Sequence, residues 1–89
     1  MGDEVIFVGK KPLMTYVLAV LTQFTSGRNE VLVKARGQMI SKAVDIVQVA
    51  KRRMSPEISI PNIEIGTEEL RGKENKTRNV SFISISLKR

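Results

Sequence analysis

The sequence predicts one small α/β domain of the α+β sandwich type, with two helices on one face of a four-stranded mixed sheet. Three observations support this prediction. The chain has 89 residues, enough for a single domain spanning 1–89. Two short apolar runs are each followed by an apolar stripe at helical spacing. Two longer alternating runs come last, which gives the order β-α-β-α-β-β with a hairpin protruding between the last two strands.

The first strand and helix are expected at residues 5–8 and from Pro12 onward. The β-rich run 5–8 ends at Gly9 and is interpreted as a strand buried on both faces. Pro12 suits the first turn of a helix, where its missing N–H costs nothing. Ser26-Gly27 supplies the helix stop. The apolar stripe between them consists of Leu13, Met14, Val17, Leu18, Leu21 and Phe24.

The second strand and helix are expected at residues 31–33 and 38–54. The run 31–33 is interpreted as another buried strand, followed by a turn at Arg36-Gly37. Ser55-Pro56 ends the helix, and cations crowd its last turn, where they suit the helix dipole. The stripe of this helix consists of Ile40, Val44, Val47 and Met54, with Ala43 and Ala50 beside it.

Two strands are expected in the remainder of the chain. The isoleucines at 58 and 60 and those at 63 and 65 alternate in opposite phases, so a bulge or edge irregularity is predicted at Pro61-Asn62. Ile83, Ile85 and Leu87 alternate with serines. Residues 66–78 have few large apolar groups, so they form either a protruding hairpin arm or a flexible loop. With about six residues per side, such an arm would reach roughly 20 Å at ~3.3 Å per residue.

Charge points to a polyanion as the partner. Fifteen Lys and Arg residues stand against nine Asp and Glu residues, for a net charge of +6. Residues 10–53 hold nine bases and two acids, whereas residues 54–89 hold six bases and five acids. A concentrated excess is typical of an electrostatic footprint rather than a basic tail. Charge alone leaves open the alternative of a merely solubilising surface.

Composition argues against several other classes of function. Without His or Cys the chain lacks a Cys/His zinc site, a thiol nucleophile and the commonest general base, so we expect no enzyme, no metal and no cofactor. Glu68 and Glu69 point to opposite faces if they lie on a strand. The acidic start Met1-Gly2-Asp3-Glu4 argues against a secretory signal, and no apolar run is long enough to cross a membrane, so an intracellular protein is expected. A small core without disulfides favours at least a homodimer.

Two strand-to-helix junctions carry cations. Gly9-Lys10-Lys11-Pro12 occupies the first junction, where backbone N–H groups and the helix dipole favour an anion. A plain turn with two solvated lysines is the alternative. The second junction lies at the same end of the sheet, and the carboxyl ends of strands are where ligands gather in parallel arrangements. The cations expected to converge there are Lys10, Lys11, Lys34 and Arg36, with Lys42 one turn further on.

At these residues the chain resembles the Alba family of archaeal chromatin proteins. The resemblance covers nearly the whole sequence, and its first two blocks together are highly specific. The matching text is Val8-Gly9-Lys10-Lys11-Pro12, Met14, Tyr16-Val17-Leu18-Ala19, Val33-Lys34-Ala35-Arg36-Gly37, Ile40-Ser41-Lys42-Ala43-Val44-Asp45, Ile65-Gly66-Thr67 and Asn79-Val80-Ser81.

The resemblance implies a fold similar to the C-terminal domain of translation initiation factor 3. It also implies a homodimer that binds and condenses double-stranded DNA with little sequence preference, binds RNA, and resides in the cytoplasm on the chromosome (nucleoid). By the same resemblance, the dimer body is expected to present the paired lysines to the DNA backbone, and the arms are expected to reach toward minor grooves. Acetylation of Lys10, set by an acetyltransferase and a deacetylase, is the implied control. The nucleic-acid-binding residues expected are Lys10, Lys11, Lys34, Arg36, Lys42, Arg71, Lys73, Lys76 and Arg78.

The sequence departs from the family pattern in ways that bear on function. Gln38 replaces a common basic residue, Met54 replaces a Phe used in dimer–dimer packing, and Thr15 replaces an Asn. Three glutamates lie among the bases of the arm and should weaken its attraction for DNA.

An RNA-directed protein, either an RNA chaperone or a subunit of an RNA-processing particle, is the alternative function. Phe7 and Tyr16 lie in apolar contexts, so both are expected to pack in the core. They are not expected to form an aromatic platform on which single-stranded nucleic acid stacks.

Overall fold

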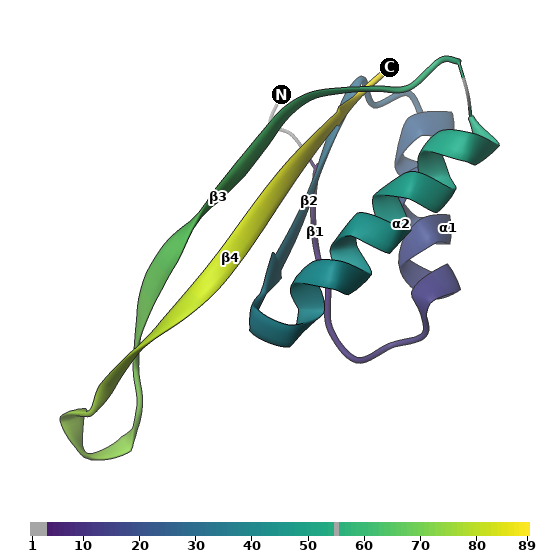
Figure 1. Ribbon diagram of the computed structural model, residues 1–89. Coiled ribbons are helices and arrows are strands. Elements are labelled where there is room, and N and C mark those ends of the chain that lie inside the picture. Colours follow the sequence, from purple (N-terminus) through teal and green to yellow (C-terminus); the bar gives the residue numbers. More distant parts are fainter. Residues whose placement is uncertain (1–3, 55) are drawn as a thin grey trace.

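The computed structural model describes residues 4–54 and 56–89, and within them the elements follow the predicted order (Figure 1). They are β1 (Glu4–Phe7), α1 (Leu13–Thr25), β2 (Glu30–Arg36), α2 (Ile40–Arg53), β3 (Ser59–Arg71) and β4 (Thr77–Lys88), with single 3-10 turns at Gly37–Met39 and Lys73–Asn75. The acidic start at residues 1–3 and the predicted helix stop at Ser55 lie outside the described residues. Neither of the described helices is long and apolar enough to cross a membrane.

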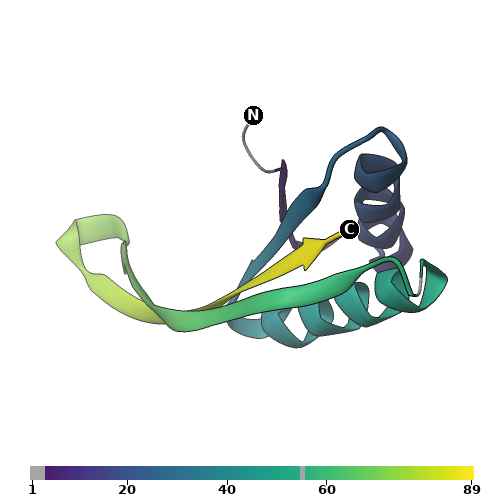
Figure 2. The same cartoon turned by 90° about the horizontal axis from the view of Figure 1, so that it is seen from above.

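The four strands form one mixed sheet in the order β1-β2-β4-β3. β1 pairs with β2 in parallel, and β4 lies antiparallel to both β2 and β3. It follows that β3 runs in the same direction as β1 and β2. Both helices lie on one face of this sheet and leave the other face open (Figure 2). The predicted fold class is therefore confirmed.

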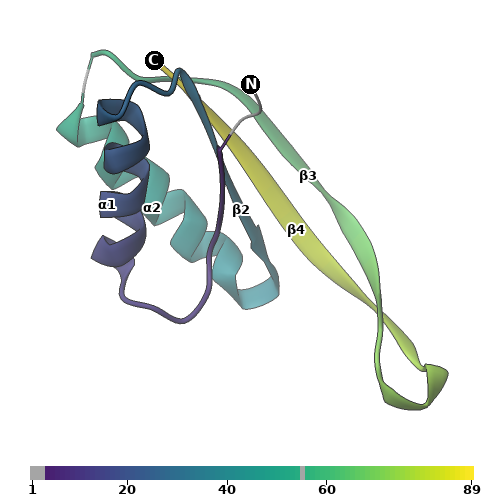
Figure 3. The ribbon, with the colours of Figure 1, turned by 180° about the vertical axis from the view of Figure 1, so that it is seen from behind.

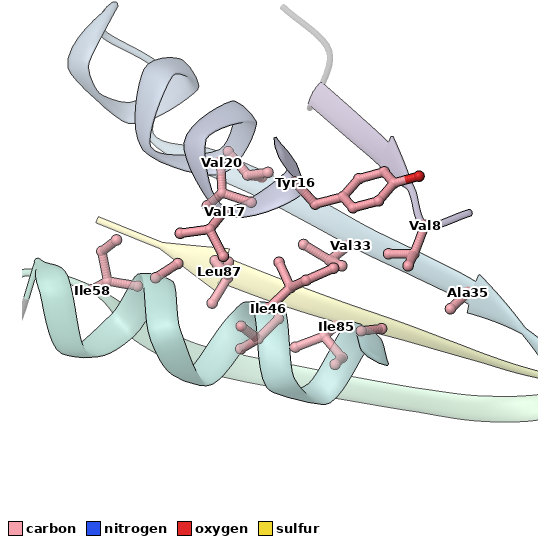
Figure 4. Close-up of a cluster of buried hydrophobic side chains, with 14 of the residues drawn as sticks. Val8, Tyr16, Val17, Val20, Val33, Ala35, Ile46, Ile58, Ile85 and Leu87 are labelled. Carbon is pink, nitrogen blue, oxygen red and sulfur yellow. The ribbon is translucent and has the colours of Figure 1, made fainter. Parts of the chain in front are cut away.

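The hydrophobic core lies between the helices and the covered face of the sheet (Figure 4). α1 contributes Val17, Val20 and Phe24, each fully buried, and α2 contributes Ile46 and Val47. Burying one such side chain stabilises the fold by about 1.5–3 kcal/mol. The predicted core position of Tyr16 is confirmed, because only 9% of this residue is exposed. The strands supply chiefly Val31, Val33, Ile83, Ile85 and Leu87.

Burial of the first two strands on both faces is a prediction that the structure contradicts. Phe7 is 67% exposed, and Leu32 is only half-buried, whereas Val8, Val31 and Val33 belong to the core. The cause is the one-sided architecture: successive strand residues point to opposite faces, and helices cover only one of them. Core packing of Phe7 is therefore wrong, and its ring lies on the open face.

The helical stripes also differ in detail from those predicted. Met14 and Leu18 are 38% and 55% exposed, because α1 turns Tyr16 and Val20 toward the sheet in their place. In α2 the fully buried Ile46 lies outside the predicted stripe. When apolar residues cover more than one face of a helix, the sequence does not show which of them face the sheet.

The β3–β4 hairpin continues beyond the rest of the sheet as an arm (Figure 1). A register shift between Ser59 and Asn62 confirms the predicted bulge or edge irregularity. β2 ends with the pair Arg36–Phe82, whereas β3 and β4 stay paired as far as Arg71–Thr77. We call residues 67–81 the arm. Five residues on each strand extend it by about 17 Å at ~3.3 Å per residue, so an extended hairpin, and not a flexible loop, accounts for the molecular length of 47 Å.

Candidate nucleic-acid interface

Three cation-bearing segments project from the same end of the sheet (Figure 3). β1, β2 and β3 run in one direction, so the carboxyl ends of β1 and β2 and the base of the arm lie at one edge of the sheet. The first leads into the loop before α1, the second into the 3-10 turn before α2, and the third into the arm. The prediction that the two strand-to-helix junctions lie at one end is confirmed, and the arm extends from that end as well.

A buried tyrosine fixes the loop that carries the paired lysines. We call residues 9–12 the lysine loop, and both Lys10 and Lys11 are exposed on it. The Tyr16 hydroxyl oxygen accepts hydrogen bonds from the backbone N–H groups of Gly9 (2.8 Å) and Lys11 (3.3 Å). Figure 4 shows this hydroxyl directed toward the end of β1. The ring is anchored in the core, so the core holds the loop in place.

Lys42 holds the carbonyl groups of the same loop. Its Nζ donates to the carbonyl oxygen of Gly9 (2.7 Å) and to that of Lys11. The ammonium group also lies 5.2 Å from the centroid of the Tyr16 ring, within the range of a cation–π contact. An ammonium has three N–H donors, and two of these are directed at the loop. Lys42 is therefore half-buried beside the lysine loop rather than projecting from it.

Lys34 and Arg36 point to the open face of the sheet. They alternate with Val33 and Ala35, which are buried under the helices. The pair Lys34 and Arg36 is adjacent to the lysine loop, because the backbone N–H of Val8 donates to the carbonyl of Lys34 (2.9 Å). The two groups of cations nevertheless lie on different segments. The structure thus brings both groups to one edge, with Lys10 and Lys11 on the loop that leads toward the helices.

Arg36 has a partner that sequence reasoning missed. Its Nε lies 2.7 Å from Oε2 of Glu68 at the base of the arm, and the two side chains are 54% and 37% exposed. An exposed pair of this kind contributes at most about 1 kcal/mol. No local sequence pattern predicts this pair, because it depends on the pairing of β4 with both β2 and β3, which places Glu68 near Arg36 across the sheet. A carboxylate therefore already occupies one side of this guanidinium.

The four predicted cations of the arm surround one shallow depression at its tip. All four are exposed, and Leu70, Gly72 and Thr77 complete the lining. Glu74 and Asn75 turn the chain there with positive φ angles of 63° and 59°. A second groove joins Gln38 to the base of the arm. The cations around the tip are Arg71, Lys73, Lys76 and Arg78, and Arg78 also lines the groove near Gln38.

An exposed apolar surface lies beside α2, and Lys51 and Arg52 border it. Ile63 and Ile65 on the edge strand β3 are 56% and 75% exposed. They pair with Ile85 and Ile83, so they share the helix-covered face but extend past the helices. Ile63 and Val44 line a shallow hollow between β3 and α2. Neighbouring exposed isoleucines on an edge strand offer an apolar contact surface.

Comparison with known proteins adds a second line of evidence. The sequence model of the Alba family matches residues 4–67. "DNA/RNA-binding protein Alba 1" of Archaeoglobus fulgidus is 49% identical over 98% of this chain and 97% of its own length. "DNA/RNA-binding protein Alba" of Methanocella arvoryzae is 52% identical over 98% of this chain and 91% of its own.

Solved structures agree with the sequence comparison. Alba from Thermoplasma volcanium superposes with a TM-score of 0.89 at 46% identity, over 97% of this chain and 100% of that one. ALBA1 from Trypanosoma brucei, at 20% identity, shares the fold with a TM-score of 0.79 over 100% of this chain and 71% of that one. Family match, identity and fold together show that this chain belongs to the Alba family.

Proposed function

We propose that this chain is a non-catalytic protein that coats and compacts double-stranded DNA as a chromatin protein and also binds RNA. The observation that carries the proposal is the common edge from which the lysine loop, the end of β2 and the arm all project with cations. The names of the relatives, which specify DNA and RNA binding, support it. Such a protein acts where the chromosome lies, in the cytoplasm at the nucleoid.

The proposed contacts are with the sugar–phosphate backbone. Lys10 and Lys11 supply the anchor, because the loop that carries them is already held in one conformation. Lys34, Arg36 and the four cations of the arm extend the contact. Lys42 belongs to the same cationic surface by charge, although its ammonium already has two carbonyl partners. Phosphate contacts carry no sequence information, so binding is expected to discriminate little between sequences.

The protein is proposed to act as a homodimer, joined through the apolar surface beside α2. A second copy placed there would cover Ile63 and Ile65 and leave the cation-bearing edge free. The Ile65→Asp variant should sediment as a monomer, and the exposed Leu18→Asp on α1 serves as its control. A dimer that persists in Ile65→Asp would place the interface elsewhere.

Acetylation of Lys10 is the proposed control of binding. Lys10 is exposed, as an acetyltransferase and a deacetylase would require. Acetylation removes a positive charge from a phosphate contact and so weakens binding. Lys10→Gln mimics this change, whereas Lys10→Arg keeps the charge.

A salt titration with duplex DNA tests the proposed function directly. Each neutralised phosphate contributes ~0.9 to the slope of log K against log salt. About four phosphates per monomer give a dimer a slope near −7. A slope flatter than about −2 would contradict the proposal.

Competition between nucleic acids tests the RNA-directed alternative. Duplex DNA and a structured RNA of equal length compete for the protein at fixed salt. Comparable affinities agree with a protein that binds both. A large preference for RNA would favour an RNA chaperone or a subunit of an RNA-processing particle over the chromatin protein.

A further inference from the structure

The open face of the sheet carries a hollow that shares Lys34 and Arg36 with the backbone-binding edge but also has an aromatic lining. Two neighbouring rows of paired residues line it. The first row crosses all four strands and consists of Phe7, Lys34, Ser84 and Glu64, while the second consists of Arg36, Phe82 and Gly66. Six of these seven residues line the hollow, together with Glu68 and Met39. Ser84, which is small and 7% exposed, lies between the larger side chains.

The hollow presents two aromatic rings. The side chain of Phe7, on the four-residue strand β1, is apolar yet 67% exposed. Its neighbours Ile6 and Val8 pack with the core. The ring of Phe82 lies against Gly66, where a Cβ atom would come within 2.7 Å of it. Gly66 is therefore the residue that leaves room for this ring. β2 lies between the strands that carry the two rings, so Phe7 and Phe82 line separate parts of the hollow. The exposed face of Phe7 is open to a flat ligand.

The charged groups around the rings balance. Lys34 and Arg36 face Glu64 and Glu68 in the same hollow, and Arg36 is paired with Glu68. Because its charges balance, the hollow exerts little long-range electrostatic attraction on a phosphate chain, whereas the lysine loop attracts one. Its carboxylates instead accept hydrogen bonds, and a cation beside them can meet a single phosphate. Aromatic faces, hydrogen-bond acceptors and one cation together match the chemistry of a nucleotide.

We propose that this hollow binds an unpaired base of a single-stranded nucleic acid, which stacks on Phe7 while Lys34 meets the adjoining phosphate. The proposal rests on the proposed nucleic-acid binding and adds to it a second site with a different ligand. A base inside a duplex is already stacked on its neighbours and shows only its edges. The site therefore distinguishes unpaired strands from duplex DNA.

The carboxylates of the hollow give the site a base preference. Glu64 and Glu68 accept hydrogen bonds, and the exocyclic amino group of cytosine donates them. Uracil has a carbonyl in the corresponding place, which a carboxylate repels. An oligomer of cytidine should thus bind more tightly than an oligomer of uridine of the same length and charge.

A tryptophan reporter tests stacking at Phe7 directly. The chain contains no Trp, so Phe7→Trp introduces a single fluorophore into the hollow. Leu18→Trp, on the exposed side of α1, is the matched control. An eight-nucleotide cytidine RNA should quench the fluorescence of Phe7→Trp and leave that of Leu18→Trp unchanged. Equal quenching of both variants, or quenching of neither, would overturn the proposal.

Removal of the ring tests the contribution of Phe7 to affinity. Stacking of one base is worth about 1–3 kcal/mol by alanine substitution, which corresponds to a 5- to 150-fold loss. Phe7→Ala should weaken binding of the cytidine RNA by this factor, leave its salt slope unchanged, and alter duplex DNA affinity by less than about twofold. Phe7→Trp should retain tight binding. An equal loss for both ligands, or no loss for RNA, would overturn the proposal.

Several outcomes separate this site from its competitors. The cytidine DNA oligomer, compared with its RNA counterpart, shows which kind of strand the hollow prefers, and binding of either one supports the site. A change of oligomeric state in Phe7→Ala would mean that the ring covers a protein interface instead, and would overturn the proposal. Failure of the unsubstituted protein to bind duplex DNA would refute the proposed function, whereas duplex binding with an inert hollow refutes this inference alone.

Discussion

The lysine loop and the arm carry similar charge from the same end of the sheet but differ in how firmly they are held. Tyr16 and Lys42 bind both the N–H and the carbonyl groups of the loop from the core side. The arm is a two-stranded ribbon whose tip residues are all exposed, and two-stranded ribbons are marginally stable alone. A preorganised contact loses less entropy when it binds. The loop should thus supply affinity, and the arm should supply reach and adaptability.

Removal of the paired lysines should have the largest effect. Lys10→Ala with Lys11→Ala deletes four phosphate contacts per dimer, so affinity should fall about 100- to 1,000-fold at 0.1 M salt, alike for all sequences. The salt slope should flatten by about 3.6. Fluorescence anisotropy across a salt series measures both quantities. Arg53→Ala with Lys88→Ala removes equal charge from the opposite end and is the control; equal losses in the two variants would refute the assignment.

Loosening of the loop without removal of its lysines should have the next largest effect. Lys42→Met removes both carbonyl contacts, so we expect about a tenfold loss of affinity and faster hydrogen exchange at the Gly9 and Lys11 amides. Tyr16→Phe should accelerate the same amides with no change of charge. If Lys42 acts through the loop, Lys42→Met should cost nothing more in a chain that already lacks both loop lysines. An undiminished cost there would identify Lys42 as a phosphate contact itself.

Substitutions in the arm should cost less than those in the loop. Four cations and three glutamates leave the arm with a small net charge, and its contacts must become ordered on binding. Arg71→Ala with Arg78→Ala should reduce affinity about fivefold and flatten the slope by less than the loop variant does. The same anisotropy series gives both values. A loss that matches the loop variant would remove the distinction between fixed and adaptable contacts.

Release of Arg36 should give a small gain. Glu68→Gln removes the carboxylate that holds the guanidinium, and because such exposed pairs are worth at most about 1 kcal/mol, affinity should rise two- to fivefold. Glu69→Gln is the matched control, because it makes the same charge change on the opposite face of the strand. Equal gains in both variants would mean that only net charge matters.

Much of the fold follows from local patterns. The residues around Gly9-Lys10-Lys11-Pro12 and Ser26-Gly27 predicted the first helix, and the phase change at Pro61-Asn62 predicted the bulge. Phe7 was misplaced because an apolar run does not show whether helices cover one face of a strand or both. The alternation of Lys34 and Arg36 with core residues in the next strand was the signal that one face is open.

The contacts that define the site depend on tertiary structure. Lys42 reaches the lysine loop from a helix that begins far along the chain, so its carbonyl partners follow only from the packing of α2 against that loop. Glu68 meets Arg36 through the registers of three strands. Charge pattern predicted which end of the sheet is cationic, but not which cations already have partners.

A crystal structure with a short DNA duplex tests the central claim most directly. The cations that project from the common edge of the sheet are predicted to contact phosphates, with the ammonium groups of Lys10 and Lys11 at hydrogen-bond distance and the arm along a groove. Lys42 is predicted to keep its two carbonyl partners. A duplex bound elsewhere, or a lysine loop buried against the partner subunit, would contradict this account.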